Sequence, residues 1–227
     1  MPRGKQPKAK CTYCGEESVK SRMTKHLSTC LQRQETITQA ERRNVRTETL
    51  YYLRVQPAWT SPFWLDLEVT GSATLKDIDS YLRAIWLECC GHLSRFSSGG
   101  WGGGEISMRR RVQEVFEPGV ELTHIYDFGT SSETLIKALE IREGKPTTHH
   151  PIVLMARNQM PELQCQECDE AAAWLCNECI YEEERTGMLC NRHARTHPHE
   201  EYGEPLAIVN SPRVGMCGYE GPADPPY

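Results

Sequence analysis

Two short stretches in the first third of the chain alternate apolar and polar positions. In residues 63–69 the pattern puts Phe63, Leu65, Leu67 and Val69 on one side of the chain, with more polar residues between them. Residues 50–55 carry a similar signal. A period of two is typical of a strand with one buried face, so these stretches predict a half-buried antiparallel pair.

The apolar spacing then lengthens to three or four residues, which is the period of a helix. Thr74 followed by Asp77 predicts a capping box at the start of this helix. Its repeating apolar positions are Leu75, Ile78, Leu82, Ile85, Trp86 and Cys89. We expect the helix to pack on the sheet.

Further strands are predicted at residues 93–96, 121–127, 134–141 and 152–155, with the turn DFGTSS between the second and the third. The stretch SSGGWGGGE is too rich in glycine for regular structure, so we expect a mobile loop there. The whole pattern predicts an α+β fold with a central mixed or antiparallel sheet and a packed helix.

Smaller units are predicted on both sides of this body. Residues 1–10 have four Lys or Arg but no periodic apolar positions, which predicts a disordered basic tail. Residues 11–30 predict a metal-binding finger, and residues 31–48 predict a polar linker, in part helical. We expect the α+β domain over residues 49–160, a zinc-binding module packed on it over 161–221, and a tail over 222–227.

The charge is divided unevenly along the chain. Residues 1–54 hold 12 Lys or Arg and 5 Asp or Glu, or +7, and the other 14 and 26 give −12. A basic arm on an acidic body favours contact with DNA or RNA through the N-terminal segment. The candidate contacts are Lys5, Lys8, Lys10, Lys20, Arg22 and Lys25. A solvated tail that aids solubility is the alternative.

The sequence predicts no membrane contact. The longest apolar stretches, 63–69 and 152–156, are too short to cross a bilayer, and no apolar segment follows the basic start. We therefore expect the protein in the cytosol. Thiols stay reduced there, so paired cysteines near histidines favour metal over disulfides.

The first metal motif has the spacing C-x2-C-x11-H-x3-C, formed by Cys11, Cys14, His26 and Cys30. A CxxC turn places two thiolates on one edge of a tetrahedron, and residues at i and i+4 of a helix supply the other two ligands from one face. Such ligands indicate zinc. Few apolar residues lie in this stretch, so metal binding is expected to supply its folding energy.

Eight candidate ligands lie close together near the C-terminus. Their paired spacing resembles the cross-brace of a B-box module, in which the first and third pairs bind one zinc and the second and fourth pairs bind another. The first set is Cys165, Cys168, Cys190 and His193, and the second is Cys176, Cys179, His197 and His199. With the finger, about three zinc ions are expected.

Two alternatives exist for the C-terminal ligands. A single-zinc ribbon with some exposed histidines fits the spacing as well. Cys217 is able to replace His199, although a buried free thiol is the more common role for such a residue. All these sets offer four protein ligands and no open position, so we expect structural sites.

A catalytic site is the minor hypothesis. His92 lies beside Cys89 and Cys90, and Asp127 or Glu88 is a candidate to orient it, as in a Cys/His nucleophile pair. No oxyanion-hole signature accompanies these residues. The DFG triplet lacks the other protein-kinase motifs. A non-enzymatic protein is therefore the preferred interpretation.

Four blocks of sequence resemble one prokaryotic family, named for the third open reading frame of plasmid pRiA4b. The blocks are LKDIDSYLRAIWLECCGHLSRF, YDFGTSSETLIKAL, IVLMARNQMPELQCQECDEAAAWLC and IVNSPRVGMCGY, so the resemblance covers residues 49–221. It implies a compact α+β domain with a curved mixed sheet. Members occur on plasmids, in mobile elements as passenger or resolvase-like (TnpR-like) proteins, and in ordinary chromosomes, without an established activity. The chain has no serine-recombinase motif.

These observations lead to three functional hypotheses. The first is a zinc-dependent, non-enzymatic protein that binds nucleic acid through its basic N-terminal segment and a protein partner through its acidic body. The second is an accessory subunit of a mobile-element or phage-defence complex that uses its zinc modules only as docking surfaces. The third is an enzyme centred on Cys89, His92 and Asp127.

Overall fold

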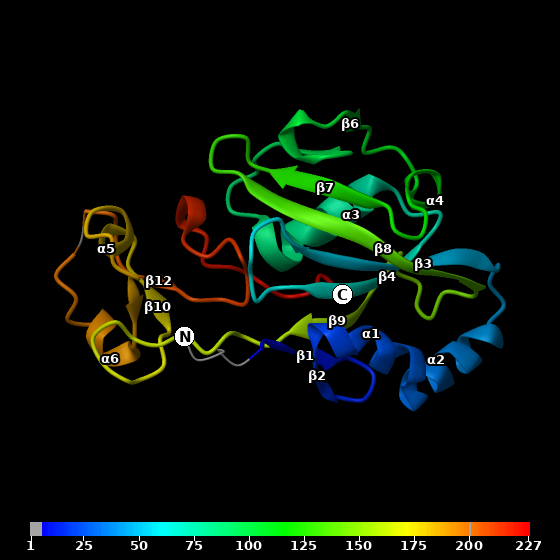
Figure 1. The fold of residues 1–227 in the computed structure, drawn as a ribbon, viewed down its shortest axis with the longest axis horizontal. Helices are drawn as coiled ribbons and strands as arrows, with labels where there is room; N and C mark the ends of the chain where they lie inside the picture. The colour runs from blue at the N-terminus through cyan, green and yellow to red at the C-terminus, as the bar shows by residue number, and fades with distance from the viewer. Residues whose placement is uncertain (1–5, 200) are drawn as a thin grey trace.

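The computed structural model describes residues 6–199 and 201–227. In this part of the chain, nine strands form a sheet in the order β2-β1-β9-β4-β3-β8-β7-β5-β6, and three short strands form a second sheet, β11-β10-β12 (Figure 1). Neighbouring strands in both sheets of the described residues pair antiparallel. The predicted α+β class is confirmed, and the sheet is antiparallel instead of mixed.

The predicted strands all lie within or beside strands of the large sheet. β3 and β4 pair as expected, in a register that joins Leu53 to Leu67. Three strands of this sheet, β1, β2 and β6, had no strand signal in the sequence. In chain order the strands are β1 (Lys8–Cys11), β2 (Glu17–Val19), β3 (Glu48–Pro57), β4 (Leu65–Thr70), β5 (Ser94–Ser97), β6 (Glu105–Ile106), β7 (Glu121–Tyr126), β8 (Ser132–Gly144) and β9 (Ile152–Asn158).

The predicted helix covers one face of the sheet as α3 (Leu75–Leu82), which continues as a π-helix, η1 (Arg83–Leu87). Its capping box is confirmed, because the Asp77 N–H donates to Thr74 Oγ1 at 3.3 Å and the Thr74 N–H donates to Asp77 Oδ2 at 2.7 Å. Its apolar residues join those of the central strands in the main core. A π-helical turn frequently marks a functional site.

The N-terminal segment covers part of the other face, and this changes how β4 is buried. Helices α1 (Lys20–Thr29) and α2 (Leu31–Glu41) follow β2, and β1 pairs with β9. Met23 and Leu27 of α1 pack in one cluster with Tyr52, Trp64 and Met155. The expected half-buried strand is therefore wrong for β4, which is buried along its whole length.

Acidic residues of β4 that the pattern assigned to solvent are buried in ion pairs. Asp66 accepts from Arg54 Nε at 2.8 Å. Glu68 accepts from Arg33 of α2 at 3.0 Å and from Arg142 of β8 at 2.8 Å. The N-terminal helices therefore rest on a polar strip of the sheet as well as on its apolar residues.

Three predicted irregular segments have structure. Residues 8–10 of the predicted disordered tail lie in β1, and residues 1–5 fall outside the described residues. Most of the predicted linker is helix α2. In the predicted C-terminal tail Ala223 is buried, and the ring of Tyr227 stacks on His150 at 3.8 Å between centroids.

The glycine-rich loop after β5 is held by specific contacts. It contains the 3₁₀ turn η2 (Gly100–Gly102), whose first N–H donates to Thr123 Oγ1 at 3.0 Å. The Arg95 guanidinium lies 4.8 Å from the centroid of the Trp101 ring. The short helix α4 (Val112–Val115) follows β6. The DFG segment is a turn, as predicted, with Asp127 Oδ1 accepting from the Gly129 N–H at 2.9 Å.

A small lobe stands apart from the large sheet, at the left of Figure 1. It consists of β10 (Trp174–Leu175), α5 (Asn177–Tyr181), β11 (Met188–Leu189), α6 (Asn191–Ala194) and β12 (Leu206–Ala207). We call it the C-terminal lobe.

Residues 208–227, called here the C-terminal segment, return to the body and include η3 (Met216–Gly218). Ser211 Oγ donates to the Trp86 carbonyl at 2.7 Å at the end of η1. Among the residues that the structure describes, none of the helices combines the length and the hydrophobicity that a bilayer span requires.

Candidate metal centres

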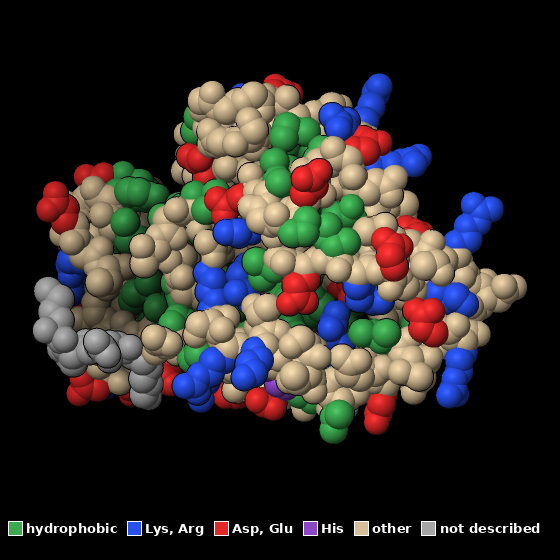
Figure 2. Space-filling model, turned by 45° about the vertical axis from the view of Figure 1, so that its right-hand side comes forward, with side chains coloured by type: hydrophobic (Ala, Val, Ile, Leu, Met, Phe, Trp, Pro, Cys, Tyr) green, Lys and Arg blue, Asp and Glu red, His purple; other side chains and the backbone are tan. Residues whose placement is uncertain are grey.

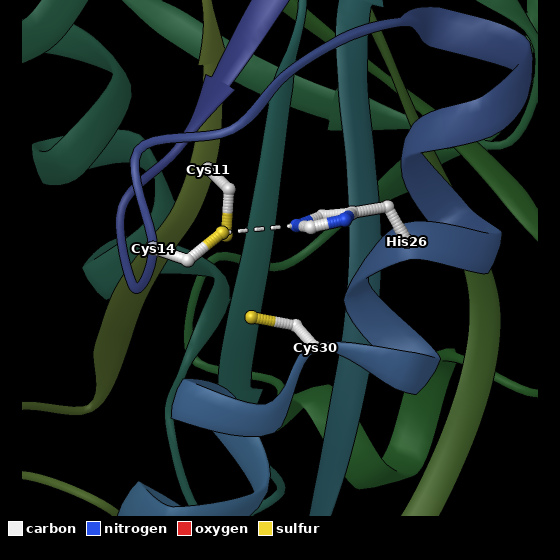
Figure 3. A group of neighbouring side chains, drawn as sticks. All are labelled: Cys11, Cys14, His26 and Cys30. Atoms are coloured by element: carbon white, nitrogen blue, oxygen red, sulfur yellow. Dashed lines mark hydrogen bonds between the residues drawn. The ribbon is translucent and has the colours of Figure 1, made fainter.

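The first group of ligands, called the N-terminal group, is built from a turn and a helix. Cys11 ends β1, and Cys14 lies in the following turn, which the left-handed Gly15 closes with a hydrogen bond to the Cys11 carbonyl at 2.9 Å. His26 projects from α1, and Cys30 caps that helix. Figure 3 shows the four side chains pointing toward one centre.

The surroundings of the N-terminal group suit a cation. Burial raises the pKa of the Cys11 thiol to about 11, so ionising it requires a compensating positive charge. The Glu16 carboxylate lies 3.3 Å from His26 Nδ1, on the ring edge opposite the Nε2 atom that faces Cys14. A carboxylate in that position orients a metal-binding imidazole and strengthens it as a ligand.

The next group, called the first C-terminal group, consists of Cys165, Cys168, Cys190 and His193. His193 Nδ1 lies 3.4, 3.6 and 3.5 Å from the sulfurs of Cys165, Cys168 and Cys190 respectively. Burial opposes ionisation of Cys165, but hydrogen bonds from backbone N–H groups, that of Glu167 first, outweigh it and lower its pKa to about 6. This thiol is therefore prepared to ionise and bind metal.

The other set in the lobe, called the second C-terminal group, consists of Cys176, Cys179, His197 and His199. Cys179 Sγ lies 3.3 Å from His197 Nε2 and 3.4 Å from His199 Nδ1. The Glu183 carboxylate lies 3.2 Å from His199 Nε2, which repeats the arrangement at His26. The two C-terminal groups have the composition that the cross-brace spacing predicted.

The distances in these groups match the edges of a tetrahedral metal site. Zinc bonds of about 2.3 Å to sulfur and about 2.0–2.1 Å to nitrogen give edges of about 3.8 Å between two sulfurs and about 3.5 Å between sulfur and nitrogen. Cys168 and Cys190 have their sulfurs 3.9 Å apart, and the sulfur–nitrogen distances lie between 3.3 and 3.7 Å. The cysteines are unpaired, since a disulfide requires about 2.05 Å.

Cys217 does not join the second C-terminal group, and it is exposed instead of buried. It lies with Cys89, Cys90 and His92 in a fourth set, called here the clasp group. In the sequence, three of these residues suggested a nucleophile pair, and Cys217 suggested either a buried free thiol or a substitute for His199. The one available signal was the compact CCGH string, because Cys217 is 127 residues away from Cys90.

The catalytic alternative brings the expected residues into proximity. His92 Nε2 lies 3.5 Å from Asp127 Oδ2, and Glu88 accepts from Tyr126 Oη at 3.0 Å. Asp127 is also bound by Arg213 at 2.7 Å, which occupies the oxygen that faces His92. The structure also places Cys217 and Arg213 beside these residues, and neither belongs to a nucleophile motif.

The candidate nucleic-acid contacts are not equally available. Lys10, Arg22 and Lys25 are exposed, and Lys8 is exposed with its Nζ 3.9 Å from Glu17. Lys20 is half-buried, and its Nζ binds Gln56 and lies 6.0 Å from the Trp64 ring centroid. Lys5 lies outside the described residues.

No protein-family model matches the chain, and no curated protein matches it. One similar solved structure is a protein of unknown function, MM3350 from Methanosarcina mazei Go1. It has 19% sequence identity and a TM-score of 0.41, and the match covers 48% of this chain and 69% of that chain. A likeness of this size supports no argument, so the resemblance to the pRiA4b family stays a prediction.

Proposed function

We propose that the protein is a zinc-dependent binding protein without catalytic activity, with one ion in the N-terminal group and one in each C-terminal group. Two of these groups are Cys3His and the third is Cys2His2. Thiolate and imidazole ligands in tetrahedral sets are typical of zinc. The match between the ligand distances and tetrahedral edges carries this proposal.

The proposed ions are structural. Each group supplies four protein ligands, which leaves no position for a reacting water. In the C-terminal lobe the buried apolar cluster consists only of Cys176, Cys179 and Leu189, with a few partly buried neighbours. So small a core does not offset the entropy of folding, so metal binding supplies most of the stability of the lobe.

The proposal is tested by comparing the zinc content of the wild type with that of variants that each lack one ligand. The variants Cys14→Ser, Cys168→Ser and Cys179→Ser are each expected to bind one zinc ion fewer than the wild type, as counted by elemental analysis and native mass spectrometry. His149→Ala is the control, because His149 belongs to none of the groups. Equal zinc content in the wild type and all three cysteine variants would contradict the proposal.

The partner proposed for the N-terminal segment is a nucleic acid. Arg22 and Lys25 lie on the exposed face of α1, where they line a hollow beside the N-terminal group. Lys10 is exposed on β1. Glu16 and Glu17 line the same hollow, and Figure 2 shows Lys and Arg interspersed with Asp and Glu over the face it draws. The proposed contact is therefore small and made to phosphates, without reading of bases.

Salt dependence tests this contact. Binding to a duplex DNA and to a single-stranded RNA is measured from about 50 to 200 mM salt. The binding constant K falls as salt rises, and on duplex DNA each lost phosphate contact reduces the steepness of log K against log salt by about 0.9. We expect Arg22→Ala and Lys25→Ala each to make this salt dependence less steep. Arg109 is an exposed arginine near α4, and Arg109→Ala is expected to leave the salt dependence unchanged.

Absence of salt-sensitive binding to either nucleic acid would rule this partner out. Recovery of a protein partner that survives nuclease treatment would favour the docking role in a larger complex. The zinc proposal is unaffected by either result.

A further inference from the structure

The clasp group joins two parts of the chain that are far apart in sequence. Cys89 and Cys90 follow the π-helix η1 after its C-cap, Glu88, and His92 lies two residues beyond Cys90. Cys217 comes from η3 in the C-terminal segment. One ligand atom of each residue lies within 4.8 Å of the others.

Most of the distances between ligand atoms of the clasp group are close to the edges of a tetrahedral metal site. The sulfur of Cys90 lies 3.8 Å from that of Cys89 and 3.7 Å from that of Cys217. His92 Nε2 lies 3.0 Å from Cys90 Sγ and 3.4 Å from Cys217 Sγ. The two sulfur–sulfur distances and the distance from His92 to Cys217 match the edges of about 3.8 Å and about 3.5 Å expected for zinc, and the distance from His92 to Cys90 is shorter than that edge. The sulfur–sulfur distances are too long for a disulfide, which requires about 2.05 Å.

The backbone at and near the clasp group includes residues in the left-handed conformation. In the described part of the chain three residues other than glycine have a left-handed φ, and two of them are Cys217, at 52°, and Asp127, at 64°. Such a conformation costs free energy and is kept where the surrounding structure requires it. At Cys217 it accompanies a sulfur that lies beside Cys90 and His92.

Neighbouring groups are placed to stabilise a bound thiolate. Arg213 Nη2 donates to Cys89 Sγ at 3.5 Å, and Tyr126 Oη lies 3.7 Å from the same sulfur. Arg213 is fully buried, and its other contact from Nη2 is to Asp127 at 2.7 Å. A cation and a hydroxyl behind a ligand sulfur offset the charge of a metal–thiolate site.

We propose that Cys89, Cys90, His92 and Cys217 form a fourth zinc site, which fastens the C-terminal segment to the end of η1. With it, all eleven cysteines of the chain belong to Cys/His metal groups. The ion would close a loop of more than 120 residues that contains β5 to β9 and the whole C-terminal lobe. Because these four ligands come together only in the folded chain, the binding energy of the ion would stabilise the folded state.

Zinc content again provides the first measurement, on the full-length protein. Cys217→Ser and His92→Ala are expected to bind one zinc ion fewer than the wild type and to keep the ions of the other three groups. His149→Ala, which removes an exposed imidazole outside the group, is expected to bind the same number as the wild type. Full zinc content in both clasp variants overturns the proposal.

Thiol labelling of the wild type provides a second measurement that does not depend on the folding of a variant. Cys90 and Cys217 are both exposed, so free thiols there are accessible to iodoacetamide. We expect both to be protected in the zinc-loaded protein and to be labelled after chelation. Immediate labelling before chelation, or a disulfide between them, overturns the proposal. Neither result affects the three ions proposed above, because their ligands are other residues.

Discussion

Asp79 is the residue on which the polar interior of the body depends. It lies on α3 with a fully buried side chain, and it accepts from His124 Nε2 at 2.9 Å, Ser94 Oγ at 2.6 Å and Arg83 Nε at 3.0 Å. Burial opposes its ionisation, but hydrogen bonds from His124 and Ser94 outweigh it and hold the pKa of this carboxyl well below its usual range. One carboxylate thus links the helix to β5 and β7.

We predict that Asp79→Asn lowers the free energy of unfolding by about 3–5 kcal/mol at pH 7, because it leaves Arg83 and His124 without their anionic partner. The depressed pKa means that the carboxylate stabilises the fold above the unfolded-state value of about 3.9 and loses this effect as the pH falls below it. The difference between wild type and variant is therefore expected to be the same at pH 7 and pH 5.

Urea unfolding of both proteins at the two pH values checks this. Both proteins carry the same metal groups, so acid release of metal affects them alike and cancels in the difference. Ser80→Ala, an exposed change on the same helix, serves as the control. A difference between wild type and variant that grows as the pH falls from 7 to 5 would mean that the pKa of Asp79 is raised, contrary to its contacts.

At the scale of elements, the sequence predicts well those helices and strands whose formation depends on residues close together in the chain. The capping box at Thr74 and the alternation in β4 are local signals, and both elements form where they were expected. Helix α2 was predicted only as a linker that is helical in part, because its apolar positions are sparse. It is held by a distant contact, since Arg33 binds Glu68 across 35 residues. The packing of the N-terminal segment on the sheet also explains why β4 is buried along its whole length.

The metal groups follow the same division. A CxxC turn and a His–Cys pair four residues apart fix their own geometry, so the N-terminal group could be assembled from spacing alone. The division of the eight C-terminal ligands into two groups of four also followed from the sequence, because in a cross-brace the first and third pairs bind one ion and the second and fourth pairs bind the other. The clasp group could not be found in this way, because Cys217 meets His92 across 125 residues and only the folded chain brings them together.

At the scale of the whole molecule, two parts depend on different forces. The body has a continuous apolar core shared by α3, η1 and the central strands. The C-terminal lobe has a very small buried cluster beside eight candidate metal ligands. The segment around the N-terminal group is expected to depend on metal less than the lobe does, because Met23 and Leu27 anchor α1 on the sheet independently of any ion. Removal of metal should therefore affect the parts unequally.

We predict that chelation makes the lobe sensitive to trypsin while the body from β3 to β9 stays resistant. Arg185, Arg192 and Arg195 are exposed cleavage sites in the lobe, and local unfolding of the chain around them is what permits cutting. Mass spectrometry of a time course, with zinc-supplemented protein as the control, follows each site. Cleavage after Arg22 and Lys25 in α1 is expected to be slower than in the lobe, because the apolar contacts of that helix persist without metal.

Equal cleavage of body and lobe after chelation would show that the metal groups and the core form a single cooperative unit. The only covalent connections between the two parts are the chain before β10 and the C-terminal segment, and the latter is bound to the body by Ser211 and Arg213 through contacts that contain no metal. Those contacts would hold the segment in place while the lobe unfolds. A lobe that unfolds alone is therefore the outcome that the distribution of buried apolar residues requires.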